Sequence, residues 1–85
     1  MSIEETLKER GDRYGDFKGY AVLDEHFKKV YEFSGSKIEA VHQAGLDMIF
    51  GKIARILNGD PNYADNWHDI AGYATLVEKE LNKLD

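Results

Sequence analysis

The fold is decided by a helical pattern near the middle of the chain, residues 36–59, with the sequence SKIEAVHQAGLDMIFGKIARILNG. Ser36-x-x-Glu39 has the form of a capping box, which predicts that a helix begins here. Apolar residues then recur mostly at intervals of three and four, as they do on the buried face of an amphipathic helix. The predicted core positions are Ile38, Leu46, Ile49, Ile53 and Ile56. Gly59 and Pro61 are typical of the end of such a helix.

Two helices are predicted before this one. A second capping box, Ser2-x-x-Glu5, begins a short helix that we expect to end at Gly11. Residues 11–19 hold three glycines and no apolar period, so we expect an irregular connection there. The next helical pattern covers about residues 20–33, and the pair Ser34-Gly35 ends it.

One more helix is predicted after the central one, beginning near residues 62–65 and running almost to the end of the chain. Its apolar residues are again three and four apart. Its predicted core positions are Trp67, Ile70, Ala74, Val77, Leu81 and Leu84. Because no segment alternates apolar and polar residues as a strand does, the sequence predicts an all-α protein, a compact bundle of about four helices in a single domain, residues 1–85.

The amino-acid composition excludes several classes of function for this chain. The chain is 42% hydrophobic, enough for a folded core, and has no cysteine, which excludes disulfides, thiolate metal sites and cysteine nucleophiles. A net charge of -5 opposes binding to the nucleic-acid backbone. The N-terminus lacks the features of a signal peptide, and no apolar run approaches the roughly 20 residues of a membrane span, so we expect a soluble, cytoplasmic protein that does not bind membranes.

Zinc and nucleophilic catalysis are not expected. His26, His42 and His68 lie on different predicted helices without the one-turn spacing of a helical zinc pair, and His42 falls on an apolar face, where we interpret it as a core residue. No Gly-x-Ser-x-Gly motif or Walker-type loop is present.

One group of charged residues is a candidate site for a phosphate and a metal ion. Lys52 falls inside the apolar arc of the central helix, with Arg55 at its edge. Asp65 and Asp69 lie four apart on the last helix and therefore share one face. Because Mg²⁺ sites that handle phosphates use one or two carboxylates plus substrate oxygens, these four residues can hold a nucleoside phosphate. The alternatives are that Lys52 extends its ammonium to solvent and that the aspartates only favour the helix N-terminus.

Two further features bear on a ligand. The first is a cluster of two guanidinium groups, which can bind phosphate, and a ring that can stack on a base: Arg10, Arg13 and Tyr14. A solvated turn with Tyr14 packed on the bundle explains these residues equally well. Gly72 costs its helix about 1 kcal/mol relative to alanine, which suggests that a helix, a second subunit or a ligand approaches the backbone there.

Several blocks of sequence resemble an uncharacterised family of small phage and prophage proteins: ERGDRYGDF at 9–17, LDMI at 46–49, KIARILNGDP at 52–61 and DNWHDIAGYA at 65–74. More distantly, a lysine and an arginine on one helix with spaced aspartates and a tyrosine on the next resemble the MazG-type all-α nucleotide pyrophosphatases and phage nucleotide-modification domains. This likeness implies nucleotide chemistry and adds Tyr73 to the candidate ligand-binding residues. The chain departs from those enzymes in lacking their Glu-x-x-Glu and Glu-x-x-Asp pairs in its two C-terminal helices.

These observations support three hypotheses. The first is a phage-type protein of the bacterial host cytoplasm that binds a nucleotide, with Asp65 and Asp69 on Mg²⁺ and Lys52, Arg55 and Arg13 on phosphates, and with pyrophosphohydrolase activity as an extension. The second is a non-enzymatic acidic module that binds a host protein, such as a component of host defence. The third is structural and makes Lys52 and Asp69 an ion pair between helices. Because a bundle this small often completes its core by association, we also expect a homo-oligomer.

Overall fold

A computed structural model describes residues 2–83, and in that range it contains four helices and no strand. The helices are α1 (Ile3–Tyr14), α2 (Phe17–Ser34), α3 (Ala40–Asn58) and α4 (Ala64–Asn82). The predicted all-α class with about four helices is therefore confirmed. None of these helices is both long enough and apolar enough to cross a membrane.

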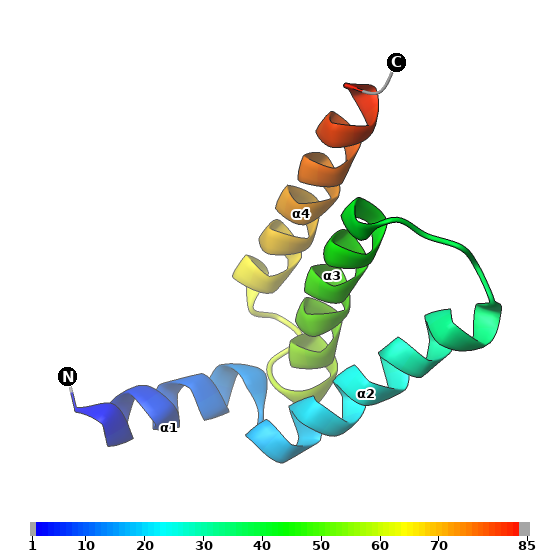
Figure 1. Cartoon of the computed structure of the whole chain (residues 1–85). Coiled ribbons are helices and arrows are strands. Elements are labelled where there is room, and N and C mark those ends of the chain that lie inside the picture. Colours follow the sequence, from blue (N-terminus) through cyan, green and yellow to red (C-terminus); the bar gives the residue numbers. More distant parts are fainter. Residues whose placement is uncertain (1, 84–85) are drawn as a thin grey trace.

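The centre of the molecule is an antiparallel hairpin of α3 and α4, against which α2 packs (Figure 1). Gly45 lets the two hairpin helices approach, because a Cβ there would overlap the side chain of Val77. Between α2 and α3 the contact is aromatic, with the ring of Phe50 stacked on Phe27 and Tyr31 at centroid distances of 5.2 and 6.4 Å. The packed part of the protein thus consists of α2, α3 and α4.

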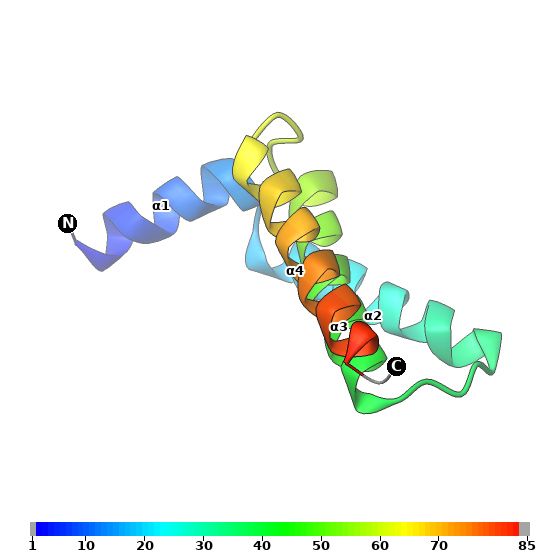
Figure 2. The same ribbon diagram turned by 90° about the horizontal axis from the view of Figure 1, so that it is seen from above.

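Helix α1 lies apart from this bundle. It contacts α3 and projects away from the hairpin on the side opposite to α2 (Figures 1 and 2). The radius of gyration is 14.8 Å, whereas a compact chain of this length has about 12 Å. The accessible surface of 6425 Å² likewise exceeds the roughly 5,100 Å² of a monomer of this mass. Among residues 2–83 only Ala54 and Ile56 are buried apolar side chains larger than glycine, so the shape is open.

The first two helices extend further than the sequence pattern predicts. Ser2 caps α1 as expected, its hydroxyl accepting a hydrogen bond from the Glu5 amide at 3.1 Å. Gly11 does not end the helix, which continues to Tyr14, and α2 begins at Phe17. The irregular connection predicted for residues 11–19 is therefore only Gly15 and Asp16. Gly15 breaks the helix because its backbone has a φ of 81°, a left-handed conformation that favours glycine.

Helix α3 begins later than predicted. Glu39, and not Ser36, is the N-cap, and His42 completes the capping box by accepting a hydrogen bond from the Glu39 amide at 3.1 Å. His42 therefore caps the helix from a partly buried position, and it is not the fully buried core histidine that the sequence suggested. Of the predicted core positions Ile56 is buried, and Ile38, Leu46, Ile49 and Ile53 are partly buried.

The buried face of α4 keeps the predicted positions Ile70 and Val77 but is otherwise rotated from the predicted one. Asn66 is fully buried, and Asp69, Ile70, Tyr73 and Val77 are partly buried, whereas Trp67 is 56% exposed. Ala74 and Leu81 are also exposed, and Leu84 lies outside the described residues. The indole N–H of Trp67 donates to the Pro61 carbonyl at 3.0 Å, which holds that side chain over the connecting loop. This bond favours the observed rotation of the helix.

Candidate functional site

The last two residues of α1 and the turn that follows them, residues 13–16, are the structural centre of the candidate site, and we call this segment the elbow. The side chain of Asn58, the last residue of α3, donates hydrogen bonds to the carbonyl oxygens of Tyr14 at 3.1 Å and Asp16 at 2.8 Å. The Asp60 amide donates to the Arg13 carbonyl at 2.7 Å. These three bonds, which we call the elbow clasp, tie the elbow to the C-terminal end of α3.

Two glycines allow this close approach. A Cβ at Gly15 would overlap the backbone and side chain of Asn58, and a Cβ at Gly59 would overlap the backbone of Arg13 and Tyr14. The two segments lie in the sequence blocks RYGDF and LNGDP, which the clasp therefore brings into contact. Because the colliding atoms include backbone, no side-chain rotation makes room for a larger residue.

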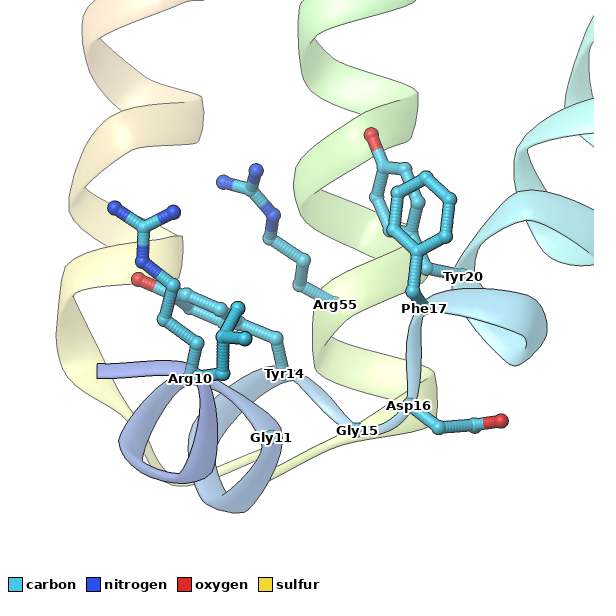
Figure 3. Close-up of a pocket in the computed structure, with 9 residues that line it drawn as sticks. Arg10, Gly11, Tyr14, Gly15, Asp16, Phe17, Tyr20 and Arg55 are labelled. Carbon is cyan, nitrogen blue, oxygen red and sulfur yellow. The ribbon is translucent and has the colours of Figure 1, made fainter. Parts of the chain in front are cut away.

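A pocket of about 550 Å³ lies in the corner between α1, the start of α2 and α3 (Figure 3). Its lining joins basic and aromatic side chains to the elbow backbone. The lining residues are Leu7, Arg10, Gly11, Tyr14, Gly15, Asp16, Phe17, Tyr20 and Arg55. We call it the elbow pocket. The elbow clasp fixes the angle between α1 and α3, which form its walls, and therefore determines the shape of the pocket.

The cationic groups of the pocket come from two helices. The side chains of Arg10 on α1 and Arg55 on α3 extend toward the same side, whereas the Asp16 carboxylate points away from both (Figure 3). No ion pair to Arg10 or Arg55 is present within residues 2–83. The pocket thus holds two guanidinium groups whose charge is not neutralised by a paired carboxylate there.

Aromatic rings surround Arg55. Its guanidinium carbon lies 4.8 Å from the ring centroid of Tyr14 and 5.6 Å from that of Tyr20. Phe17 stacks on Tyr20 with a centroid distance of 6.3 Å and an interplanar angle of 25°. Cation–π contact orients the guanidinium while leaving its N–H donors free at the edge. The result is a positioned donor group beside rings on which a planar ligand can stack.

Arg13, a predicted phosphate ligand, does not line this pocket. It forms an ion pair with Glu9 at 3.2 Å and lies over the ring of Tyr63, 4.4 Å from its centroid. The phenol of Tyr63 raises the pKa of Arg13, and a hydrogen bond donated by Tyr63 to Asp65 at 2.9 Å is the main cause of a raised pKa of Tyr63 itself. Tyr14 packs edge-on against Tyr63, and neither Arg13 nor Asp65 lines the elbow pocket.

Lys52 and Asp69 form an ion pair between α3 and α4, with Nζ and Oδ2 2.8 Å apart. The Lys52 side chain is 11% exposed and that of Asp69 is 40% exposed. The lysine therefore does not extend to solvent but has a carboxylate partner. Its hydrogen bond lowers the pKa of Asp69, and the charges of His68 and Arg55 act in the same direction. This geometry agrees with the structural hypothesis for the pair.

The remaining candidates lie elsewhere. Tyr73 lines a groove further along the hairpin and not the elbow pocket. Within residues 2–83 no three carboxylate or histidine side chains are grouped as a metal site, so Asp65 and Asp69 would supply at most two ligands to a Mg²⁺ ion. Around Gly72 there is open space within the chain, and the close neighbour predicted there is not found among the described residues.

The chain matches a family described as a domain of unknown function, DUF6378, over residues 3–81. It belongs to that family. No significant match was found among curated proteins or solved structures. The family description names no activity, so the similarity to phage proteins and to MazG-type pyrophosphatases stays a prediction.

Several residues of the candidate site in this DUF6378 member carry little signal in the sequence. Asn58 is absent from the predicted site, although it directly precedes the helix-ending Gly59, where a side-chain amide can reach a neighbouring turn. Phe17 falls in the predicted loop, Tyr20 on a predicted helix face, and Tyr63 has no predicted role. Their periodicity gives no indication of a site, because the elbow that brings them together depends on contacts between α1 and α3.

Proposed function

We propose that the elbow pocket binds a nucleotide or a closely related phosphorylated aromatic compound. The observation that carries this proposal is the presence of Arg10 and Arg55 in one pocket with Tyr14, Phe17 and Tyr20. Guanidinium groups bind phosphate oxygens with paired N–H donors, and an aromatic ring stacks on a base. The pocket volume of about 550 Å³ lies within the range of small-molecule sites, roughly 300–1,000 Å³.

The two guanidinium groups of the elbow pocket, which form no ion pair within residues 2–83, favour an anionic ligand there. The chain carries a net charge of -5, so a phosphate compound is repelled by most of the surface at long range. Arg10 and Arg55 create a local exception, and Arg55 is held by Tyr14 and Tyr20 before any ligand arrives. A donor oriented in advance loses less conformational entropy on binding.

Magnesium and hydrolysis form the extension of the proposal that the MazG resemblance implies. Asp65 and Asp69 would hold Mg²⁺ together with substrate phosphate oxygens, and Lys52 would lie beside the ion. Both carboxylates already have partners, Tyr63 and Lys52. Since binding needs only the pocket arginines, we place nucleotide binding first, in a phage-type protein of the bacterial host cytoplasm.

A second candidate function is favoured by exposed apolar side chains at the end of α2. Phe33 is 93% exposed and Val30 is 62% exposed. Contiguous exposed apolar patches mark surfaces that bind other proteins, and these two side chains lie three residues apart on the same helix. Under this hypothesis the protein is a non-enzymatic module that binds a host protein, and the elbow pocket is only a gap beside α1.

Thermal unfolding with a ligand panel separates the two candidates. The panel contains mono-, di- and triphosphates of each nucleoside, cyclic dinucleotides and inorganic pyrophosphate, with and without Mg²⁺. A ligand present at 100 times its Kd stabilises the folded state by about 2.7 kcal/mol, which raises the Tm of a small domain by roughly 10 °C or more. We expect a selective rise with a nucleotide and a smaller one with pyrophosphate.

Single substitutions test whether the rise in Tm comes from a ligand bound in the elbow pocket. Arg10→Ala should abolish most of the rise, whereas Lys8→Ala, which removes the same charge from the same helix outside the pocket lining, should keep it. Arg55→Lys keeps the charge but loses the fork and should weaken the response. A panel without any selective rise, or an equal loss in Lys8→Ala, would refute the proposal and favour the protein-binding candidate.

A further inference from the structure

A second groove runs along the α3–α4 hairpin, away from the elbow pocket. It has a volume of about 370 Å³ and contains Glu80 as its one charged lining residue within residues 2–83. Its apolar walls are formed by Val41, Ala44 and Met48 of α3 and by Tyr73, Leu76 and Val77 of α4. We call it the hairpin groove. It shares no lining residue with the elbow pocket, so a role for the groove is independent of the proposed nucleotide function.

The spacing of the groove residues is that of a helix-bundle interface. On α3 they are three and four apart, at 41, 44 and 48, and on α4 they lie at 73, 76, 77 and 80. Such stripes on two neighbouring antiparallel helices form half of a four-helix bundle core. Yet Met48 is 48% exposed and Leu76 is 61% exposed, so the stripes have no cover within the described residues of the chain.

The surface area of the chain agrees with a missing partner. The accessible surface exceeds that of a compact monomer by about 1,300 Å². A standard interface buries about 800 Å² per partner, and obligate homodimers bury more. This excess, taken over the whole chain, is larger than the area that one partner contributes to a standard interface.

The small number of buried apolar side chains indicates which kind of partner covers the hairpin groove. Within residues 2–83 only Ala54 and Ile56 are buried apolar side chains larger than glycine, and a chain of this size needs a larger core to be stable alone. The cover must therefore be present whenever the chain is folded. A second copy of the same chain meets this condition, and an isologous contact needs only one self-complementary face. Two chains of charge -5 repel each other at long range, and the groove lining adds one acidic residue, Glu80, per copy to the contact.

We propose that the hairpin groove is a homodimer interface, in which the α3–α4 hairpins of two copies pack into a four-helix bundle. Sedimentation equilibrium or light scattering after gel filtration tests the stoichiometry. The wild-type protein should be a dimer at micromolar concentration. Leu76→Arg should shift it to monomer or increase its dissociation constant at least 100-fold, and Phe33→Arg, on α2, should leave the dimer intact.

Cysteine cross-linking keeps the proposal testable even where Leu76→Arg fails to fold, because the chain has no cysteine of its own. Disulfides form when the Cα atoms lie about 4.4–6.8 Å apart, which on a two-fold axis selects the residues near the axis. Among Ala44→Cys, Met48→Cys and Leu76→Cys, at least one should form a dimer on oxidation faster than Phe33→Cys does. A monomeric wild-type protein, or cross-linking at Phe33→Cys as fast as at every groove position, would overturn the proposal.

Discussion

The elbow and the hairpin groove differ in how far their surfaces are covered by other parts of residues 2–83. At the elbow, Asn58 and Asp60 bond to backbone carbonyls, and Gly15 and Gly59 let two chain segments touch. In the hairpin groove, apolar side chains with regular spacing remain exposed. The polar contacts of the elbow are thus formed within one chain, whereas the apolar side chains of the groove stay exposed among residues 2–83.

The difference shows how a chain of 85 residues divides its interactions. Hydrogen bonds depend on direction, so a few of them define the angle of the elbow without a large buried area. Apolar burial is proportional to area, and a short chain has too little of it to cover every helix face. A site formed at the elbow and stability gained by association are therefore compatible.

The largest effect should come from filling the elbow contact. Gly59→Ala places a Cβ against the backbone of Arg13 and Tyr14, which overpacks the clasp and should destabilise the protein by about 2–3 kcal/mol. For a domain of this size the Tm should fall by roughly 10–20 °C in thermal unfolding followed by circular dichroism.

The matched control is Gly72→Ala. Gly72 lies in mid-helix with open space around it, so alanine should stabilise by about 1 kcal/mol through helix propensity. An equal loss of stability in both variants would show that the clasp is not a close contact.

A smaller effect is expected from the hydrogen bonds of the clasp. Asn58→Ala removes two donated bonds to partly exposed carbonyls, and we expect a loss of about 1–2 kcal/mol. Asn58→Asp should lose more stability, because a carboxylate has no N–H to donate and would repel the two carbonyl oxygens. Hydrogen exchange at residues 15–20 should accelerate in both variants while exchange within α4 changes less. Uniform acceleration along the chain would contradict a local role for Asn58.

The smallest effect concerns the Lys52–Asp69 pair and its dependence on pH. Because the pKa of Asp69 is lowered in the folded state, its stabilising contribution is complete above the usual aspartate value of about 4 and is lost as the pH falls through the lower, folded value. The Tm difference between wild type and Asp69→Asn should therefore be present at pH 7 and shrink below about pH 4.

A double-mutant comparison isolates the pair. In a Lys52→Met background the hydrogen bond that lowers the pKa of Asp69 is absent, so Asp69→Asn should have little dependence on pH. Lys52→Met alone should unfold within roughly 5 °C of the wild type, since an apolar residue can replace a largely buried ion-pair partner. An undiminished acid dependence of Asp69→Asn in this background would assign it to another partner.

Periodicity predicted the four helices and the capping of α1 by Ser2, because these depend on residues close in sequence. It placed the end of α1 at Gly11, because a glycine in mid-helix costs only about 1 kcal/mol and does not stop a helix by itself. Periodicity also predicted that Trp67 is buried, whereas Asn66 is the buried residue. Hydrophobicity does not reveal that the indole N–H bonds to the Pro61 carbonyl and that Trp67 stays exposed.

The candidate site was anticipated only in parts. Arg10 and Tyr14 were grouped by sequence, and so were Lys52 and Arg55, but the structure regroups them. Arg55 joins Arg10 and Tyr14 in the elbow pocket, and Lys52 pairs with Asp69. Tyr73 is separated from both groups and lines the hairpin groove. Helical spacing places residues on a face but does not say which helix that face meets.

By itself the sequence determined an all-α chain of negative charge without cysteine chemistry, because composition and apolar period depend only on the order of residues. It also carried the glycines and Asn58 that the elbow needs, without showing their use. The tertiary structure decided which segments meet: the elbow on the end of α3, Arg55 beside Arg10, and α4 turned so that Asp69 reaches Lys52. These contacts join residues more than ten positions apart, and their geometry depends on helix packing and backbone approach that no local pattern encodes.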